Sequence, residues 1–386
     1  MGLSVNLEKT KVIIFRKGGY IAERERWVLA NKEVEIVNNY KYLGLILTTK
    51  LSMQTALTEF VGRAKKRVLD IHKLIHSIGY MSPMIYFKLI DSIVAPLALY
   101  CSEVWGIRDF SNIDSINLYA CKRLLGVTKK TPNCLIYSEL GRYPLSMYAS
   151  LRAVKYWLKI MCMEEERLPK LAYQRECLEA NKKNSWSKGI QSILELNGFG
   201  FVWINQGTNN INAFMRNLEQ RMKDIYHQTW HDKCINSDRC AVYISFKNEF
   251  VSEPYINVIN INKFRTAMAR LRVGASELNS NKKFIKSNAS LKCPFCTCEE
   301  TELHFLKYCL NYAELRTKYL GRHFKWNPNV GLKQILGSED TRVIKDVATF
   351  IFHAFNKRKN DIQHRSETAN TQGQRLITEF RTISVN

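Results

Sequence analysis

The sequence lacks several features that would place it in common functional classes. It has no uninterrupted apolar run of 18 residues, about the length that a helix needs to cross a membrane. It also has no signal-peptide pattern, no G-x-S-x-G motif of a serine nucleophile and no G-x-x-x-x-G-K-[ST] phosphate loop. We find no internal repeat and no low-complexity tract. These absences predict an intracellular protein, in the nucleus or the cytoplasm, with no membrane partner.

Acidic residues are scarce relative to basic ones. The chain has 35 Asp and Glu against 58 Lys and Arg, which gives a formal net charge of +23. Such an excess favours a polyanionic partner, either nucleic acid or an anionic membrane face. Hydrophobic residues make up 46% of the sequence, enough for packed cores, so the chain is not disordered. The length of 386 residues predicts two or three domains.

Cysteine is present in an odd number, 11, and without a secretion signal this predicts a reducing compartment. Four ligand-type residues fall within one short stretch: Cys293, Cys296, His304 and Cys309. Their spacing is C-x2-C, then seven residues, then H-x4-C. Because zinc prefers four tetrahedral thiolate and imidazole ligands, this spacing predicts a Zn²⁺ site.

The residues between the four ligands predict a small module. Glu299 to Glu302 keep the connection polar, while Leu303, Phe305 and Leu306 provide an apolar contact. Cys298 is a spare thiol and the residue most easily mistaken for a ligand. The alternative is that these cysteines are unrelated, since a free cysteine is often a buried small hydrophobe.

Periodicity predicts a mainly α protein with a small N-terminal β-hairpin region, an α+β fold. Lys11 to Phe15 reads as a strand, Trp27 to Ala30 and Val34 to Val37 flank a hairpin turn at Asn31-Lys32, and Tyr40 to Leu47 is rich in strand formers. From Leu57 apolar residues recur at three- and four-residue steps, which indicates a helix.

Further helices are predicted from Pro83 to a break at Pro96, from Ile113 to Leu125, from Leu145 to Met161, from Phe214 to Trp230, from Lys263 to Leu271 and from Tyr312 to Leu320. Five tryptophans in apolar surroundings are predicted core residues: Trp105, Trp157, Trp186, Trp203 and Trp230. The main domain boundary is predicted in residues 181–212, which are poor in pattern and include Asn181 to Asn184.

Several segments resemble reverse transcriptases of non-LTR (LINE-like) retrotransposons. Gly2 to Val12 is similar to the segment after the catalytic motif of these enzymes, and Asn6, Lys9 and Thr10 match its Asn-x-x-Lys-Thr signature. Tyr40 to Gly44 resembles their primer-grip hairpin. The cysteine–histidine stretch, which is followed by Tyr312 and Leu315-Arg316, resembles the family's C-terminal zinc knuckle. Three segments between the hairpin and this stretch show a weaker resemblance: Glu103 to Gly106, Glu139 to Leu145 and Arg270 to Gly274.

The resemblance spans residues 1 to about 320 and implies a division of the chain. Residues 1–50 would be the end of the palm with primer-grip-like hairpins, and 51–180 the thumb and helical linker. Residues 181–212 are the loop-rich boundary and 213–290 a helical basic segment. Residues 291–320 would be the CCHC zinc knuckle, and 321–386 a C-terminal helical segment that ends in a polar tail.

The chain departs from the family at the point that matters for catalysis. Reverse transcriptases hold two metal ions with paired palm aspartates. The family's adjacent Asp-Asp precedes its Asn-x-x-Lys-Thr signature, and this sequence contains no Asp-Asp. We therefore predict no DNA synthesis by this chain, and we expect the missing N-terminal polymerase part to be a further partner.

The expected polyanionic partners are RNA, single-stranded DNA or an RNA–DNA hybrid. By resemblance, the primer-grip-like contacts are Lys41, Tyr42, Leu43 and Gly44. The basic residues predicted to neutralise phosphates are Arg63, Lys66, Arg67, Lys73, Arg265, Arg270, Arg272 and Lys307. The alternative for the basic residues is a solvated helix face. The alternative for the primer-grip-like segment is a simple buried hairpin, which we favour because the palm is missing.

Aromatic residues near the predicted zinc site offer a second kind of contact. Phe295, Phe305 and Tyr308 could stack on RNA bases, whereas Phe295 and Phe305 fit better as packing residues of the small module. Three functions therefore stand: a nucleic-acid-binding reverse transcriptase fragment, which we favour, a zinc-stabilised protein-interaction module, and a non-functional relic of a transposable element.

Overall fold

The computed structural model describes residues 5–16, 18–19, 25–107, 111–178, 185–282, 290–325 and 329–383, and it places side chains as far as Glu367. Gly2 to Ser4 of the segment that resembles reverse transcriptases, and Asn181 to Asn184 of the predicted boundary, lie outside the described residues. The described part of the chain is mainly helical and carries two small antiparallel hairpins, as the sequence predicts.

The chain divides into two compact units that interleave along the sequence. The first unit comprises Met1–Leu74, Phe87–Tyr119 and Tyr143–Ile225, and the second comprises Ile75–Tyr86, Ala120–Arg142 and Tyr226–Asn386. We predicted consecutive segments with a main boundary in residues 181–212. That boundary stays a prediction; the interleaving of the two units is a feature that periodicity in the sequence cannot show.

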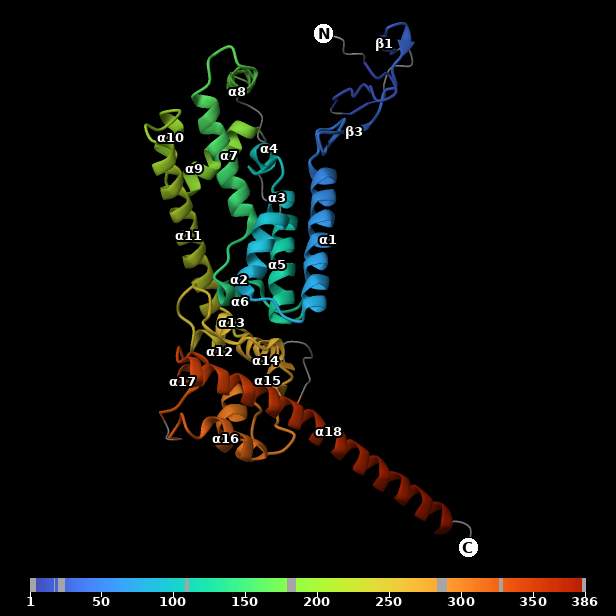
Figure 1. The fold of residues 1–386 in the computed structure, drawn as a ribbon, viewed down its shortest axis with the longest axis vertical. Coiled ribbons are helices and arrows are strands. Elements are labelled where there is room, and N and C mark those ends of the chain that lie inside the picture. Colours follow the sequence, from blue (N-terminus) through green and yellow to red (C-terminus); the bar gives the residue numbers. More distant parts are fainter. Residues whose placement is uncertain are drawn as a thin grey trace. The chain divides into compact units, whose positions relative to one another are not determined.

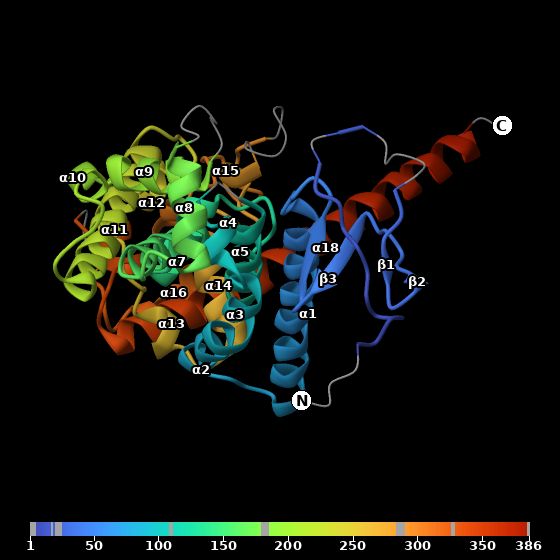
Figure 2. The ribbon, with the colours of Figure 1, turned by 90° about the horizontal axis from the view of Figure 1, so that it is seen from above.

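Both hairpins lie in the N-terminal part of the first unit (Figures 1 and 2). Strand β1 (Val28–Leu29) pairs with β2 (Lys32–Glu33), and β3 (Asn39–Tyr42) pairs with β4 (Leu45–Thr48). Each turn has two residues with positive φ: Ala30-Asn31, one position before the predicted turn, and Leu43-Gly44. Paired positive φ values match the right-handed twist of the strands. Within the part of the chain that the structure describes, the run from Lys11 to Phe15 forms no strand, and its only ladder contact is an isolated bridge from Val12 to Ile36.

Helix α1 (Gln54–Ile78) follows the second hairpin and shows the predicted periodicity. Its buried residues include Leu57, Phe60, Ala64, Val68 and Ile71. The next helix is broken as predicted: α2 (Pro83–Leu89) passes through the π-helix η1 (Ile90–Val94) into α3 (Ala95–Ala98). Pro96 has no N–H to donate to the preceding turn and its ring crowds that turn, so the helix widens there.

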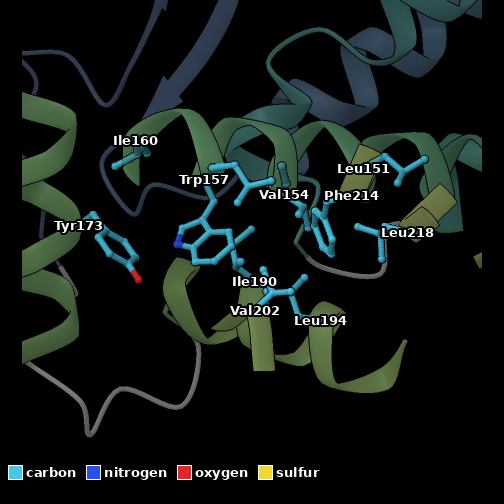
Figure 3. Close-up of a cluster of buried hydrophobic side chains, with 12 residues drawn as sticks. Leu151, Val154, Trp157, Ile160, Tyr173, Ile190, Leu194, Val202, Phe214 and Leu218 are labelled. Atoms are coloured by element: carbon cyan, nitrogen blue, oxygen red, sulfur yellow. The ribbon is translucent and has the colours of Figure 1, made fainter. Parts of the chain in front are cut away.

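The core of the first unit centres on Trp157 (Figure 3). It is formed by α7 (Leu145–Met161), α8 (Leu168–Leu178), α9 (Trp186–Leu196), α10 (Gly200–Ile204) and the start of α11 (Ile211–Ile235), and α4 (Ser102–Trp105) packs on α7. Trp105, Trp157 and Trp230 are buried, and Trp186 and Trp203 pack against the core from its edge. All five tryptophans thus take the predicted packing role.

Residues 186–204 correct our reading of a loop-rich boundary. Helix α9 is held at its start by Ser185, whose side chain accepts a hydrogen bond from the backbone N–H of Lys188. Its Ile190 and Leu194 are fully buried against α7. The stretch was misread because the helix is short and lies between segments rich in Asn and Gly, which usually indicate loops.

In the second unit, helix α18 (Thr341–Ile383) is the element on which others pack (Figure 1). Contacts join it to α13 (Tyr255–Val258), α14 (Asn262–Arg272), α16 (Ala313–Leu320) and α17 (Leu332–Leu336). The unit also contains α6 (Asn133–Leu140), α12 (Ala241–Ile244), α15 (Asn279–Lys282) and the end of α5 (Ser111–Leu125). We predicted that the polar tail after Lys357 is frayed, but the helix continues to Ile383.

Among the described residues, no helix combines the length and the apolar character that crossing a bilayer requires.

Candidate metal centre

The structure brings together the four ligand-type residues that the sequence singled out. The ligand atoms of Cys293, Cys296, His304 and Cys309 all lie within 4.8 Å of one another. The Cys309 sulfur is 3.9 Å from the Cys293 sulfur and 3.5 Å from the Cys296 sulfur. Sulfur ligands of a tetrahedral ion with bonds of about 2.3 Å lie about 3.8 Å apart. The cluster can therefore hold a metal ion, whereas Cys298 is exposed and lies outside it.

A tight reversal of the chain presents the first two sulfurs. Lys292 and Glu299 form an isolated antiparallel bridge, the Cys293 N–H donates to the Cys298 carbonyl at 2.8 Å, and the Glu300 N–H donates to the Leu291 carbonyl at 2.8 Å. The C-x2-C segment is thus the loop of a very short hairpin. Its closure fixes both cysteines on one side of the turn.

A single π-helical turn presents the other two ligands. The π-helix η2 (His304–Tyr308) begins at His304 and is followed directly by Cys309, whose N–H donates to the His304 carbonyl at 2.8 Å. Arg316 holds the end of this turn, because its guanidinium donates to the Leu306 carbonyl at 2.9 Å and to the Cys309 carbonyl at 2.8 Å. π-Turns are rare and often occur at functional sites.

The electrostatics of the cluster suit a metal ion. Burial lowers the pKa of His304, so its imidazole is neutral, which is the form that coordinates metals. Its Nε2 atom is buried and has no hydrogen-bond partner in the described structure. Burial, with the neighbouring Cys296 thiol, raises the pKa of Cys309 to about 12. A bound cation would be coordinated by a ring nitrogen of His304 and would displace the thiol protons.

Two glutamates of the polar connection between the ligands anchor the cluster inside the second unit. Glu300 is 1% exposed and accepts two hydrogen bonds from Arg358 of α18, each 2.8 Å long. Glu302 is 3% exposed and accepts a hydrogen bond from the Asn281 side chain at 3.1 Å. The sequence shows only a polar run here; the partners lie 58 and 21 residues away.

Aromatic residues around the cluster take two different roles. Phe305 is fully buried and stacks on Phe355 with ring centroids 4.7 Å apart, which confirms its packing role. Phe295 is half-buried under the guanidinium of Arg365, 5.0 Å from its ring. Tyr308 is 56% exposed, and the Lys307 ammonium lies 5.2 Å from its ring centroid. Tyr308 is therefore the outward aromatic residue of this region, whereas Lys307 is half-buried and its ammonium donates to the Val330 carbonyl at 2.9 Å.

The predicted basic face on α1 is a surface feature. Arg63, Lys66, Arg67 and Lys73 are all exposed. Arg63 lies 3.8 Å from Glu59 and Arg67 lies 3.2 Å from Asp70, so their charges are partly compensated. Lys41 also binds Glu59, at 2.6 Å. Lys66 and Lys73 therefore contribute most of the uncompensated positive charge that this face shows within the described structure.

The primer-grip-like hairpin is exposed at its tip. Tyr42 is 59% exposed and Leu43 is 74% exposed, so the expectation of a buried hairpin is wrong. Tyr100 donates a hydrogen bond to the Leu43 carbonyl, and its ring lies where a Cβ on Gly44 would meet it, at 3.7 Å. The preceding Asn6-x-x-Lys9-Thr10 signature forms a local turn in which the Asn6 side chain accepts from the Lys9 N–H at 3.1 Å.

Two of the predicted phosphate contacts are buried and require a correction. Arg272 is 1% exposed and binds Glu139 at 2.9 Å and Glu253 at 2.6 Å. Arg265 is 2% exposed and donates to the Ile259 carbonyl at 3.2 Å. A buried guanidinium cannot reach a phosphate without unpacking the helix, so these two arginines have a structural role. Arg270 remains exposed and donates to the Gly126 carbonyl at 2.7 Å.

Comparison of the sequence with models of protein families, with curated proteins and with solved structures gives no significant match.

Proposed function

We propose that this chain is a zinc-binding and nucleic-acid-binding part of a non-LTR retrotransposon reverse transcriptase, from the end of the palm through the thumb and linker to a zinc knuckle. The single observation that carries the proposal is the convergence of three sulfurs and one ring nitrogen of His304 within 4.8 Å of one another. A Cys3His set with tetrahedral spacing is a closed structural zinc site. Such a site stabilises its own fold by the free energy of metal binding.

The nucleic-acid part of the proposal is supported by charge and exposure. The net charge is +23, the basic face of α1 is exposed, and exposed Tyr308 lies beside Lys307, which is half-buried. Lysine and arginine bind phosphates without regard to sequence, and exposed aromatic rings stack on single-stranded bases. The 386 residues contain no adjacent pair of aspartates, so the proposed role is binding without polymerisation.

The zinc site is tested by counting metal in variants. In His304→Ala and in Cys296→Ser, we expect one zinc ion per chain fewer than in the wild type, measured by native mass spectrometry. Cys298→Ser is the matched control, because this exposed thiol lies beside the cluster and outside it, and it should keep the wild-type count. An unchanged count in both ligand variants would contradict the assignment.

Nucleic-acid binding is tested with a single-stranded RNA oligonucleotide at several salt concentrations. We expect the affinity to fall steeply between about 50 and 200 mM salt, because phosphate contacts release counterions. Purified protein should not extend a primer on an RNA template. Binding that is indifferent to salt would contradict the first expectation, and detectable primer extension would contradict the second.

A second candidate function, a protein-interaction module, is favoured by apolar side chains on the N-terminal segment. Phe15, Trp27 and Val28 are each about half exposed or more, with exposed fractions of 51%, 49% and 65%. Exposed apolar surface of this kind often indicates an interface, here for the polymerase part that we expect as a partner. A defined partner whose capture survives nuclease treatment would favour this candidate over RNA binding. Aggregation of the isolated protein would instead favour a relic with no selected function.

A further inference from the structure

A second group of thiols lies within the second unit, away from the Cys3His cluster in sequence. The sulfurs of Cys134, Cys234 and Cys240 all lie within 4.8 Å of one another. Cys234 is fully buried, Cys240 is 1% exposed and Cys134 is half-buried. The three come from three segments: the first turn of α6, the last turn of α11 and the residue before α12. A chance contact of buried cysteines would more often bring two together than three.

The two cysteines that are close in sequence are placed by a hydrogen-bonded loop. After α11 ends at Ile235, the Asn236 side chain donates to the Asp232 carbonyl at 2.9 Å. The Cys240 N–H then donates to the Ser237 carbonyl at 2.8 Å. This loop reverses the chain within five residues and brings the Cys240 sulfur back beside that of Cys234.

The third cysteine is placed by a loop that two cations hold. The Lys122 ammonium donates to the carbonyls of Lys129 and Thr131 and to the Asn133 side chain, at 2.9, 2.8 and 2.8 Å. Arg239, which directly precedes Cys240, donates to the Lys130 carbonyl at 3.0 Å. This loop leads straight into Cys134. Three thiolates around a divalent ion carry one net negative charge. The positively charged Lys122 and Arg239 lie beside the segments that contain these thiolates.

We propose that Cys134, Cys234 and Cys240 form a second zinc site, with three thiolate ligands and a fourth position open to solvent. The spacing admits the separation of about 3.8 Å that zinc–sulfur bonds of about 2.3 Å require. A set of three sulfurs selects thiophilic ions such as Zn²⁺ over Mg²⁺ or Ca²⁺, which prefer oxygen. Among the described residues, the cluster contains no fourth side chain of a ligand type, so water completes the coordination. Cys134 is the half-buried ligand and marks the side that solvent can reach.

This second site does not depend on the proposed function, and one set of variants separates the two. The protein is purified with a thiol reductant and ZnCl2, dialysed, and its zinc content is counted by native mass spectrometry. We expect two ions in the wild type and one in Cys134→Ser. Cys134 is at the edge of the cluster, so its variant should fold. Cys121→Ser, a fully buried thiol of the same unit outside both clusters, should keep two ions.

The atoms that coordinate the zinc ion are then identified in a variant that retains only the second site. In Cys296→Ser/His304→Ala, X-ray absorption at the zinc edge should report three sulfur neighbours and one oxygen or nitrogen neighbour. One ion in the wild type that Cys134→Ser does not remove would overturn the proposal. So would a disulfide within this trio, detected as a loss of two mass units in protein kept under reductant. One ion that only Cys134→Ser removes would support this site and sink the Cys3His site.

Discussion

Two arginines only two positions apart show how a single residue's role depends on its helix face. Arg270 and Arg272 both lie on α14, where two residues correspond to a rotation of about 200°. Arg270 therefore faces solvent, and Arg272 faces inward between Glu139 and Glu253. The planar guanidinium also lies 4.8 Å from the Phe246 ring centroid and 5.3 Å from that of Tyr255. Arginine suits such a site because it stacks and donates in a fixed plane.

Removing the inward arginine should destabilise the second unit strongly. In Arg272→Ala the buried Glu139 carboxylate, which is 0% exposed, loses the guanidinium that compensates its charge. Breaking one partner of a buried pair costs about 3–5 kcal/mol. Arg270→Ala, which removes an exposed guanidinium from the same helix, should cost less than about 1 kcal/mol. Urea denaturation of both variants measures the difference, and equal losses would refute the assigned faces.

Leu43 stores backbone strain at the tip of the second hairpin. It has φ of +47°, and at this exposed turn position Asn is the favoured residue before Gly. Leu43→Asn should therefore raise the free energy of unfolding by about 1 kcal/mol. Leu51→Asn, at another exposed position with φ of +51°, is the matched control and should give a similar gain. Thermal denaturation measures both variants. A loss at position 43 alone would show that the exposed leucine makes contacts worth more than the strain.

At the scale of elements, helix α18 anchors the segment from Cys293 to Cys309, which carries the candidate metal ligands. Arg358 binds Glu300 with two parallel hydrogen bonds, and Glu300 also accepts from the Asn279 N–H at 2.8 Å. Phe350 and Phe355 of the same helix pack on Phe305, with ring centroids 5.9 and 4.7 Å away. The segment from Cys293 to Cys309 is therefore positioned by the helix as well as by its own turn.

Loss of this anchor should loosen the segment without removing a metal ligand. Arg358→Ala leaves a buried, unpaired Glu300, which costs about 3–5 kcal/mol. We expect faster proteolysis and faster amide exchange around Cys293 to Cys309 in the metal-free protein. Lys357→Ala is the matched control, because it removes an adjacent, partly exposed ion pair to Asp361 at 3.2 Å. Unchanged exchange in Arg358→Ala would show that the turn and its ligands hold the segment alone.

Structural elements that are encoded by residues close together in the sequence could be predicted. Elements that depend on residues far apart in the sequence could not. Helices α1, α5, α7 and α14 carry strong apolar periodicity or clear end signals, and the C-x2-C and H-x4-C pairs are each local. The Cys134–Cys234–Cys240 cluster joins residues about 100 positions apart, and only the five-residue gap between its last two members hints at it. The continuation of α18 beyond Lys357 was missed because its sequence is polar.

At the scale of the whole molecule, the excess of positive charge is the property that would attract a polyanion. Of the predicted phosphate contacts, Arg265 and Arg272 are buried inside the fold and cannot contact a polyanion. Arg63 and Arg67 are partly compensated by neighbouring carboxylates. The charge that remains on α1 is therefore concentrated at a few lysines. A net charge alone predicts affinity for any polyanion, whereas this distribution predicts which residues contribute to it.

Lys66 and Lys73 lie seven residues apart on α1, so both project from the same face of the helix. Replacing both by alanine should weaken binding of single-stranded RNA. The slope of log affinity against log salt should also fall by about 1.4, since each phosphate contact on a single strand contributes about 0.7. Lys155→Ala/Lys159→Ala is the charge-matched control, because both lysines are exposed on α7 of the same unit. If the two double variants reduce the slope equally, RNA responds to the total charge and α1 is not a specific contact face; a loss confined to the α1 variant would place the polyanion along this helix.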